Sequence, residues 1–170
     1  SLTGGYGFLV PEAASANYVK MDGVAVACGP LTYSENEAGL WVMSTASLRY
    51  FTVVDSSFSD CDFGWYFQRK VDSGPGGSMA EYINVQDTLF RGNSYKGFYA
   101  EKLSEATFTN VTVENTSLLD SYFNIAWNAG IDINLKGRED YRNLVFNNLT
   151  ITGNGVGSKE GVGLALKARS

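Results

Sequence analysis

Two carboxylates stand in two similar runs of alternating apolar residues: Glu101 ends the run Gly97–Glu101, and Asp132 lies inside Gly130–Asn134. If these runs are neighbouring strands, the two side chains would be separated by the roughly 5–9 Å found between the carboxylates of glycoside hydrolases. The chain has no His, which excludes Ser-His-Asp and Cys-His triads and His-ligated zinc. It also has no Asp-Asp pair and no acidic run with calcium-loop spacing, so we expect no metal and no cofactor. Catalysis by Glu101 and Asp132 is therefore the weaker hypothesis.

Aromatic residues accompany these carboxylates at one repeated position. Trp41, Tyr66 and Tyr99 occupy the same outward position in successive runs, and Asp132 continues that column. Flat exposed rings flanked by amides and carboxylates suit sugars, whose C–H faces stack on rings while their hydroxyls bond to polar neighbours. The alternative is that the rings only stabilise the fold, or are covered by a loop or a partner chain. The predicted glycan-binding face consists of Trp41, Tyr66, Gln68, Tyr99, Glu101, Asp132 and Asn134.

The elements that would position this face are repeats. One pattern has Asp or Asn first, a large apolar residue three positions later, and a small polar residue or Cys after three more. Its copies are Asp55–Cys61, Asp87–Asn93, Asn110–Thr116 and Asn148–Asn154. A second pattern is a Gly followed by an alternating β-prone run. Its copies are Gly23–Ala27, Gly39–Met43, Gly64–Gln68, Gly97–Glu101, Gly130–Asn134 and Gly161–Ala165.

The first and third residues after each of these glycines are apolar in all six copies, which predicts that they point inward. They are Val24, Leu40, Trp65, Phe98, Ile131 and Val162, and then Val26, Val42, Phe67, Ala100, Ile133 and Leu164. The glycine before each run suits either a positive φ or a close backbone approach. The polar residues at 61, 93, 116 and 154 would form an inward ladder at a turn, bonded to neighbouring backbone groups.

Strands this short bury no face alone, so successive units must stack. We therefore predict an all-β fold, a right-handed parallel β-helix (a β-solenoid) of about five or six coils. The segments 48–67, 81–101, 104–136 and 141–167 resemble coils of the pectin-lyase-like superfamily. This resemblance implies the fold, and it raises the possibility of polysaccharide hydrolase, lyase or epimerase activity. Residues 1–20 are expected to form an N-terminal cap or extended arm, and residues 21–170 the β-helix domain.

Smaller features leave alternatives open. Cys28 and Cys61 permit one disulfide or two buried thiols, of which buried thiols are the commoner arrangement. Asn110, Asn115 and Asn148 lie in Asn-x-Ser/Thr sequons and are possible N-glycosylation sites, although three sequons are no enrichment for this composition.

Charge and composition restrict the partners. The net charge of −5 argues against nucleic acid, and no apolar run is long enough to span a membrane as a helix. Both outermost strands would expose unpaired backbone groups, so we expect contact with other copies, through Ser1–Val10 of another copy for example, or with neighbouring domains. The favoured function is an extracellular or cell-surface structural or adhesive domain, with glycans as possible ligands. The alternative is a polysaccharide-active enzyme or a carbohydrate-binding module.

Overall fold

A computed structural model describes residues 5–29, 37–69, 77–117, 129–137, 139–155 and 161–169. Every regular element in this part of the chain is a β-strand. The strands are β1 (Tyr6–Val10), β2 (Ser15–Asp22), β3 (Ala25–Ala27), β4 (Ala38–Val42), β5 (Ser47–Val54), β6 (Ser57–Ser59), β7 (Phe63–Phe67), β8 (Ala80–Gln86), β9 (Leu89–Arg91), β10 (Lys96–Ala100), β11 (Ser104–Glu114), β12 (Ala129–Lys136), β13 (Leu144–Thr152) and β14 (Val162–Arg169).

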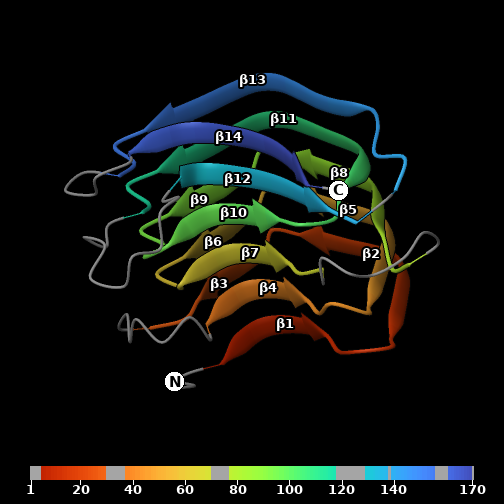
Figure 1. Ribbon diagram of the computed structural model, residues 1–170. Helices are drawn as coiled ribbons and strands as arrows, with labels where there is room; N and C mark the ends of the chain where they lie inside the picture. Colours follow the sequence, from red (N-terminus) through yellow and green to blue (C-terminus); the bar gives the residue numbers. More distant parts are fainter. Residues whose placement is uncertain are drawn as a thin grey trace.

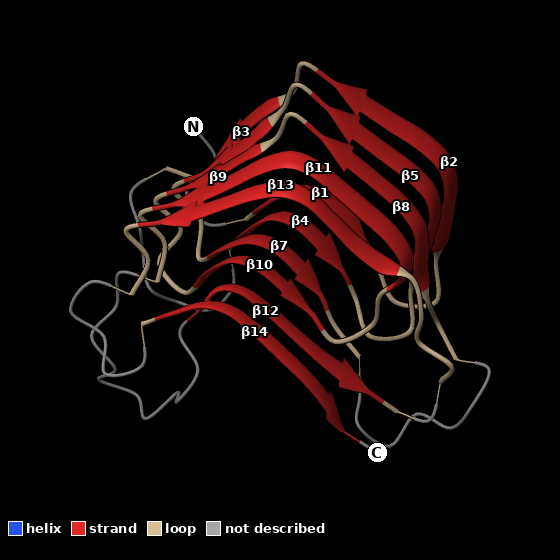
Figure 2. Ribbon diagram, turned by 90° about the horizontal axis from the view of Figure 1, so that it is seen from above, coloured by secondary structure: helices blue, strands red, loops and turns tan. Residues whose placement is uncertain are grey.

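These strands wind into a solenoid in which each turn lies on the one before it (Figure 1). One sheet has the order β1-β4-β7-β10-β12-β14, and the other has the order β2-β5-β8-β11-β9-β6-β3, with β13 paired to β11. The long strand β11 pairs in parallel with β8 through its first half and with β9 through its second half, so a turn carries three strand faces (Figure 2). The described strands make five turns, and β14 begins a sixth. The predicted parallel β-helix is confirmed, and its size is consistent with the expected number of coils.

The N-terminal segment differs from the expected cap or arm. Strand β1 pairs with β4 and β2 pairs with β5, so residues 6–22 form part of the first coil, and the expected boundary at residue 20 falls inside β2. The true first glycine run is Gly7–Val10, because Phe8 stands opposite Leu40. The run Gly23–Ala27 leads into β3, which pairs with β6 on another face. Both segments have apolar residues at the first and third positions after the glycine, so this pattern alone did not tell the two faces apart.

The core consists of the inward columns predicted for the middle coils. Each of the central members is at most 2% exposed: Leu40, Val42, Trp65, Phe67, Phe98, Ala100, Ile131 and Ile133. The last copy is displaced by two residues. Val162 pairs with Ala129 and Leu164 pairs with Ile131, so Gly163 stands opposite Gly130, where the sequence predicted Gly161. A shift of two keeps every side chain on its predicted face, so the hydrophobic pattern could not detect it.

The glycines of the middle coils, Gly39, Gly64 and Gly97, are explained by close approach and not by a positive φ, whereas Gly23 has a φ of 62°. A Cβ on Gly39 would lie 2.6 Å from the carbonyl oxygen of Gly64, and a Cβ on Gly97 would lie 2.9 Å from that of Gly130. The backbones of successive coils therefore meet at this column with no room for a side chain.

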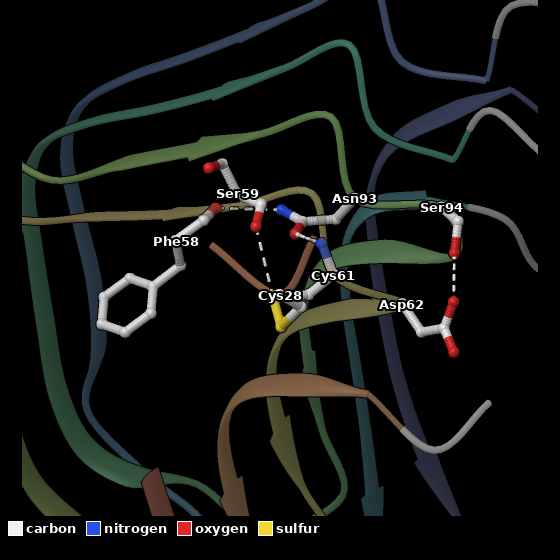
Figure 3. The surroundings of a disulfide bond; sticks show 7 residues. All are labelled: Cys28, Phe58, Ser59, Cys61, Asp62, Asn93 and Ser94. Carbon is white, nitrogen blue, oxygen red and sulfur yellow. Dashed lines mark hydrogen bonds between the residues drawn. A yellow bond between two sulfur atoms is a disulfide. The ribbon is translucent and has the colours of Figure 1, made fainter. Parts of the chain in front are cut away.

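The predicted polar ladder at the turn is confirmed. The backbone N–H of Cys61 donates to Oδ1 of Asn93 at 3.1 Å, and Nδ2 of Asn93 donates to the carbonyl of Phe58 at 3.1 Å (Figure 3). Thr116 and Asn154 repeat this arrangement two coils further on, with a 2.9 Å bond from the Thr116 N–H to Oδ1 of Asn154.

Cys28 and Cys61 form a disulfide that closes this column at its N-terminal end (Figure 3). The preference for two buried thiols was therefore wrong. The solenoid brings residues 33 positions apart onto adjacent turns. The sequence did not reveal this proximity. The repeat before Cys61 begins with Asp55, but the equivalent position before Cys28 is Gly23, so the repeat that contains Cys28 was not recognised.

Left-handed residues mark the corners of the coils. Asp55, Asp87, Asn110 and Asn148 occupy one corner column with φ between 48° and 53°. The N–H of Asp87 donates to the carbonyl of Thr109 in the next coil at 3.0 Å. Asp and Asn tolerate this conformation better than other side chains, which explains why the repeat begins with them.

The glycine column yields a stability test. Gly39→Ala is expected to lower the free energy of unfolding by about 1–3 kcal/mol, because its Cβ would force the Gly64 carbonyl and the Phe58 ring to move. Gly5→Ala is the control, since a Cβ at that position would have no heavy atom within 4 Å. Urea unfolding of the three proteins measures the difference, and equal stability of Gly39→Ala and Gly5→Ala would contradict the close-approach explanation.

The disulfide yields a second test. Replacing Cys28 and Cys61 together by Ala is expected to lower the free energy of unfolding by roughly 3–4 kcal/mol, because the unfolded chain regains the freedom of a loop of this length. The comparison is made by urea unfolding of the variant and of the oxidised protein. An unchanged transition would show that the bond does not restrict the unfolded chain.

Candidate functional site

The candidate site is the outward face of the six-stranded sheet. Trp41 pairs with Tyr66, Tyr66 with Tyr99, and Tyr99 with Asp132, so the predicted first column is present. Ala100 pairs with Ile133, so the residues that follow them, Glu101 and Asn134, lie next to each other beside this column. The β-helix thus brings the predicted residues together on adjacent strands.

The aromatic rings of this face stack on one another. The ring centroids of Trp41 and Tyr66 are 5.1 Å apart at an interplanar angle of 28°, and those of Tyr66 and Tyr99 are 5.2 Å apart at 22°. Phe63 stacks on Tyr66 at 4.8 Å. Trp41 is only 9% exposed, and Tyr66 and Tyr99 are half-buried. The expected platform of exposed rings is therefore absent from this face, because the ring faces that a sugar would need are turned toward other rings.

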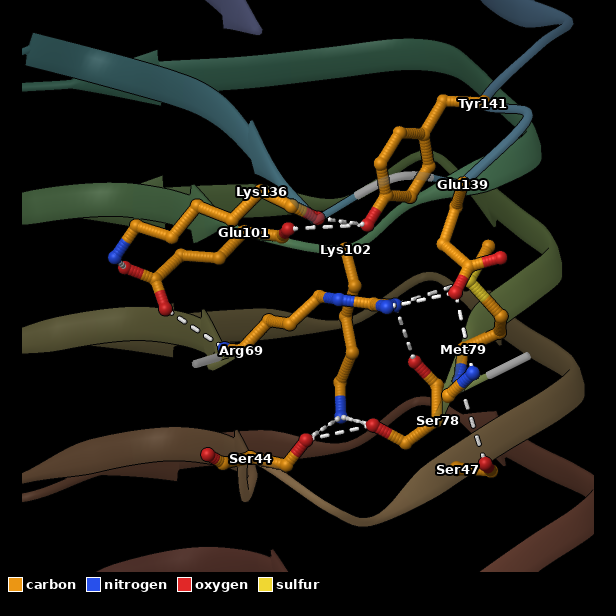
Figure 4. A network of polar contacts seen from close by, with 11 residues as sticks. Ser44, Ser47, Arg69, Ser78, Met79, Glu101, Lys102, Lys136, Glu139 and Tyr141 are labelled. Atoms are coloured by element: carbon orange, nitrogen blue, oxygen red, sulfur yellow. Dashed lines mark hydrogen bonds and ion pairs between the residues drawn. The ribbon is translucent and has the colours of Figure 1, made fainter. Parts of the chain in front are cut away.

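Glu101 is buried, with an exposure of 3%, and its carboxylate lies beside Arg69 and Lys136 (Figure 4). Its Oε2 accepts the backbone N–H of Arg69 at 2.7 Å, and its Oε1 accepts the hydroxyl of Tyr99 at 2.7 Å and pairs with Nζ of Lys136. Burial raises the pKa of Tyr99, and the neighbouring Glu101 carboxylate adds to the effect. The phenol therefore stays a donor to Glu101.

Asp132 is buried between two lysines, with an exposure of 1%. Lys96 Nζ lies 2.6 Å from its Oδ2, and Lys167 Nζ lies 2.9 Å from its Oδ1. Lys96 also sits over the ring of Tyr99, 3.9 Å from the centroid. Burial lowers the pKa of Lys96, while the attraction of Asp132 opposes that shift.

We call the outward side of the six-stranded sheet around Trp41, Tyr66 and Tyr99 the aromatic face. Both carboxylates form ion pairs on it, and neither is placed as an accessible acid or base. Asn134 donates from Nδ2 to the Tyr99 hydroxyl at 3.1 Å and is also buried, whereas Gln68 is half-buried. Outward orientation was predicted correctly for these residues, but the expected exposure of Trp41, Glu101, Asp132 and Asn134 was wrong.

A family model described as a right-handed β-helix region matches residues 5–170. The chain belongs to this right-handed β-helix family. The match includes β1 and β2, in agreement with their place in the first coil, and the resemblance based on the repeats is confirmed at the level of the fold. Comparisons with curated proteins and with solved structures returned no match.

Nothing in the described part of this right-handed β-helix resembles a metal centre: no group of three or more Cys, Asp or Glu side chains there could hold an ion. In the same residues no helix is long and apolar enough to cross a membrane.

The three sequon residues lie at left-handed corners of the right-handed β-helix. Asn110, Asn115 and Asn148 are exposed and have φ of 53°, 50° and 53°. Nδ2 of Asn148 donates to Oδ1 of Asn110 at 2.9 Å, and Nδ2 of Asn110 donates to Oδ1 of Asp87 at 2.8 Å. The backbone conformation thus accounts for Asn at these positions, and their glycosylation stays a prediction.

A second polar network lies where the chain leaves the six-stranded sheet, and the sequence analysis did not identify it. The buried Lys102 crosses two coils to donate to the carbonyls of Met43 at 2.7 Å and Ala46. It also donates to the carbonyl of Ser44 at 3.3 Å and to Oγ of Ser78 at 3.2 Å (Figure 4). Arg69 pairs with Glu139 at 2.7 Å beside it. Burial, with the nearby Arg69, lowers the pKa of Lys102 to about 7.

A ladder of three tyrosines was also missed. Tyr18, Tyr50 and Tyr82 occupy a corner column on β2, β5 and β8, with ring centroids 4.7 and 4.8 Å apart and interplanar angles of 2° and 4°. Unlike the aromatic face, this tyrosine ladder is open to solvent: its members are 79%, 43% and 44% exposed. The available signal was a Tyr five residues before Gly23, Asp55 and Asp87, the corner positions of the first three coils.

The stacked rings of the tyrosine ladder stand on backbones of an uncommon conformation. All three residues have left-handed backbones, with φ of 57°, 53° and 57°. That conformation costs an L-residue about 1–2 kcal/mol, whereas a stacked aromatic pair contributes only about 0.5–1.5 kcal/mol. The ring–ring term of two stacks is therefore no larger than the backbone cost of three left-handed residues, and Asn or Gly would adopt these corners at a lower backbone cost.

Lys102 generates a pH test. Because its pKa is about 7 in the folded protein and near 10.4 in an unfolded chain, the unfolded state binds more protons between these values. Stability should therefore rise as the pH increases from about 7 toward 9. Thermal unfolding across this range measures the slope. Lys102→Met should flatten it, whereas Lys20→Met, at an exposed position, should leave it unchanged; equal slopes in all three proteins would contradict the assignment.

Proposed function

We propose that this chain is a non-enzymatic structural or adhesive β-helix domain of an extracellular or cell-surface protein, and that it associates through the ends of its solenoid. The observation that carries the proposal is an unfinished core at both ends. Phe8 stands opposite Leu40 yet is 39% exposed, and Leu166 stands opposite Ile133 yet is 62% exposed. Their inner neighbours are 2% and 1% exposed.

Exposed apolar side chains of the described residues gather at these ends. The large ones on β1, β2, β13 and β14 are Tyr6, Phe8, Leu9, Tyr18, Val145, Val162 and Leu166. The outermost strands also present backbone groups on the side away from the solenoid, where a further parallel strand would add to the sheet. The end of another copy would bury both the apolar side chains and the strand edges.

The disulfide supports the proposed location. Cys28 and Cys61 are bonded to each other, and such bonds persist in secreted and surface-exposed proteins, whereas cytosolic thiols are kept reduced. The ion pairs of Glu101 and Asp132 support a role without catalysis, because both carboxylates are buried and already neutralised by lysines.

Association through the ends predicts a concentration-dependent oligomer. Leu9→Lys and Leu166→Lys should each weaken association by about tenfold or more, because a charge at an apolar contact must be desolvated. Asn84→Lys, on the exposed face of the central strand β8, is the matched control and should behave as the unmodified chain. Sedimentation velocity over a range of concentrations measures the effect. A monomer at every concentration, or equal effects of all three lysines, would contradict the proposal.

The glycan and enzyme alternative makes a different prediction for the half-buried Tyr66, Tyr99 and Gln68. If it holds, polysaccharides bind to or are cleaved by the unassociated chain, and Tyr66→Ala weakens binding without unfolding the domain. A glycan array and a polysaccharide depolymerisation assay test this directly. Binding or turnover would replace the structural proposal, and their absence together with association through the ends would support it.

A further inference from the structure

The tyrosine ladder presents three phenols in an arrangement that leaves their edges accessible. The rings of Tyr18, Tyr50 and Tyr82 cover one another's faces, since they are nearly parallel at 4.7 and 4.8 Å. Each ring is therefore in contact with the ring of the adjacent coil, and all three side chains are reached by solvent. Face-on stacking of a sugar or a planar ligand on Tyr50 is blocked from both sides.

We infer that the tyrosine ladder is a site of oxidative tyrosine coupling. A one-electron oxidant of the haem-peroxidase class, acting with hydrogen peroxide, would join Tyr50 to Tyr18 or to Tyr82 through a dityrosine bond. The inference goes beyond the proposed function, because it depends on the ladder and not on association through the ends.

The reaction balances without any group from the protein other than the two phenols. Each tyrosine loses one electron and the proton of its hydroxyl to give a phenoxyl radical. The two radicals join through their ortho carbons, forming one C–C bond. The hydrogen on each coupled carbon then moves as a proton to the phenolic oxygen, which restores both aromatic rings. Hydrogen peroxide takes up the two electrons and two protons and is reduced to two molecules of water.

Other tyrosines of the described residues are less suited to this chemistry. Tyr66 and Tyr99 also stack, but they are half-buried, and the Tyr99 hydroxyl donates to Glu101. Burial raises the pKa of Tyr99, which disfavours loss of its proton. Tyr95 is buried, and Tyr141 donates its hydroxyl to the carbonyl of Lys136 at 2.7 Å.

Coupling would add a second covalent bridge between coils. The disulfide of Cys28 with Cys61 joins the first coil to the second through the polar ladder. A bond from Tyr18 to Tyr50 would join the same two coils at a different corner, and a bond from Tyr50 to Tyr82 would join the second coil to the third. The coupled product should therefore resist urea better than the uncoupled chain.

The experiment treats the dilute folded chain with a haem peroxidase and hydrogen peroxide, then isolates the monomer. Cleavage after Lys and Arg, following reduction of the disulfide, places the three tyrosines in separate peptides, residues 1–20, 50–69 and 71–91. Dityrosine fluorescence in the monomer, and a peptide pair whose combined mass has lost two hydrogen atoms, report the intramolecular product. Fragmentation spectra identify the two tyrosines that are joined.

Tyr50→Phe is the decisive variant, because it keeps the central ring but removes the phenol that both pairs share. Intramolecular coupling should fall to background in Tyr50→Phe and should persist in the control Tyr6→Phe, which removes a tyrosine outside the ladder. Tyr18→Phe should leave only the bond between Tyr50 and Tyr82. The inference is overturned if the monomer carries no dityrosine, if the joined residues lie outside the ladder, or if Tyr50→Phe couples as well as the unmodified chain.

Discussion

In-register parallel pairing sets each residue of one coil about 4.8 Å from its counterpart in the next, and the other features of this right-handed β-helix follow from that repeat. A side chain has nearly the same environment in every coil, so a position that suits one residue type tends to keep it. The column of Gly39, Gly64 and Gly97 is the strictest case, since a methyl group in one coil would meet the backbone of the next. Asn93 and Asn154 show the favourable case, in which an inward amide bonds the backbone of the coil before it.

The same spacing makes like charges unfavourable neighbours, and several charged side chains pair with an opposite charge on the adjacent coil. Arg49 stands opposite Glu81 and pairs with it, and Arg142 pairs with Glu105 one position out of register. On the aromatic face, Asp132 lies between Lys96 and Lys167. Such pairs between adjacent coils bring carboxylates and cations together without any catalytic role, so a cluster of charged residues on a solenoid face is weak support for catalysis.

The sequence contained enough information to predict the fold, because the apolar period of two and the repeated Gly, Asp and Asn positions report the strand and the corner directly. It predicted which side of the strand Glu101 and Asp132 occupy for the same reason. It could not predict their burial, which depends on what packs over the outward face and not on the period of the strand. Two assignments were wrong for one reason. Gly23–Ala27 was taken for the first run in place of Gly7–Val10, and the last run was placed two residues too early, at Gly161. In both cases the correct and the wrong segment have apolar residues at the same inward positions, so only the pairing partners distinguish them.

Outward orientation and solvent exposure are therefore separate properties in this fold. The broad outward face has the residue types that suit a sugar, yet its rings cover one another and its carboxylates are paired. The corner of Tyr18, Tyr50 and Tyr82 has the opposite character: its residues are exposed, and their left-handed backbones are harder to justify by stacking alone. Because any column of identical residues gains some stability from its own repeat, residue type by itself does not separate structure from function in a solenoid. Solvent exposure is a better guide, and in the described coils it points to the corner of Tyr18, Tyr50 and Tyr82 and away from the sheet face.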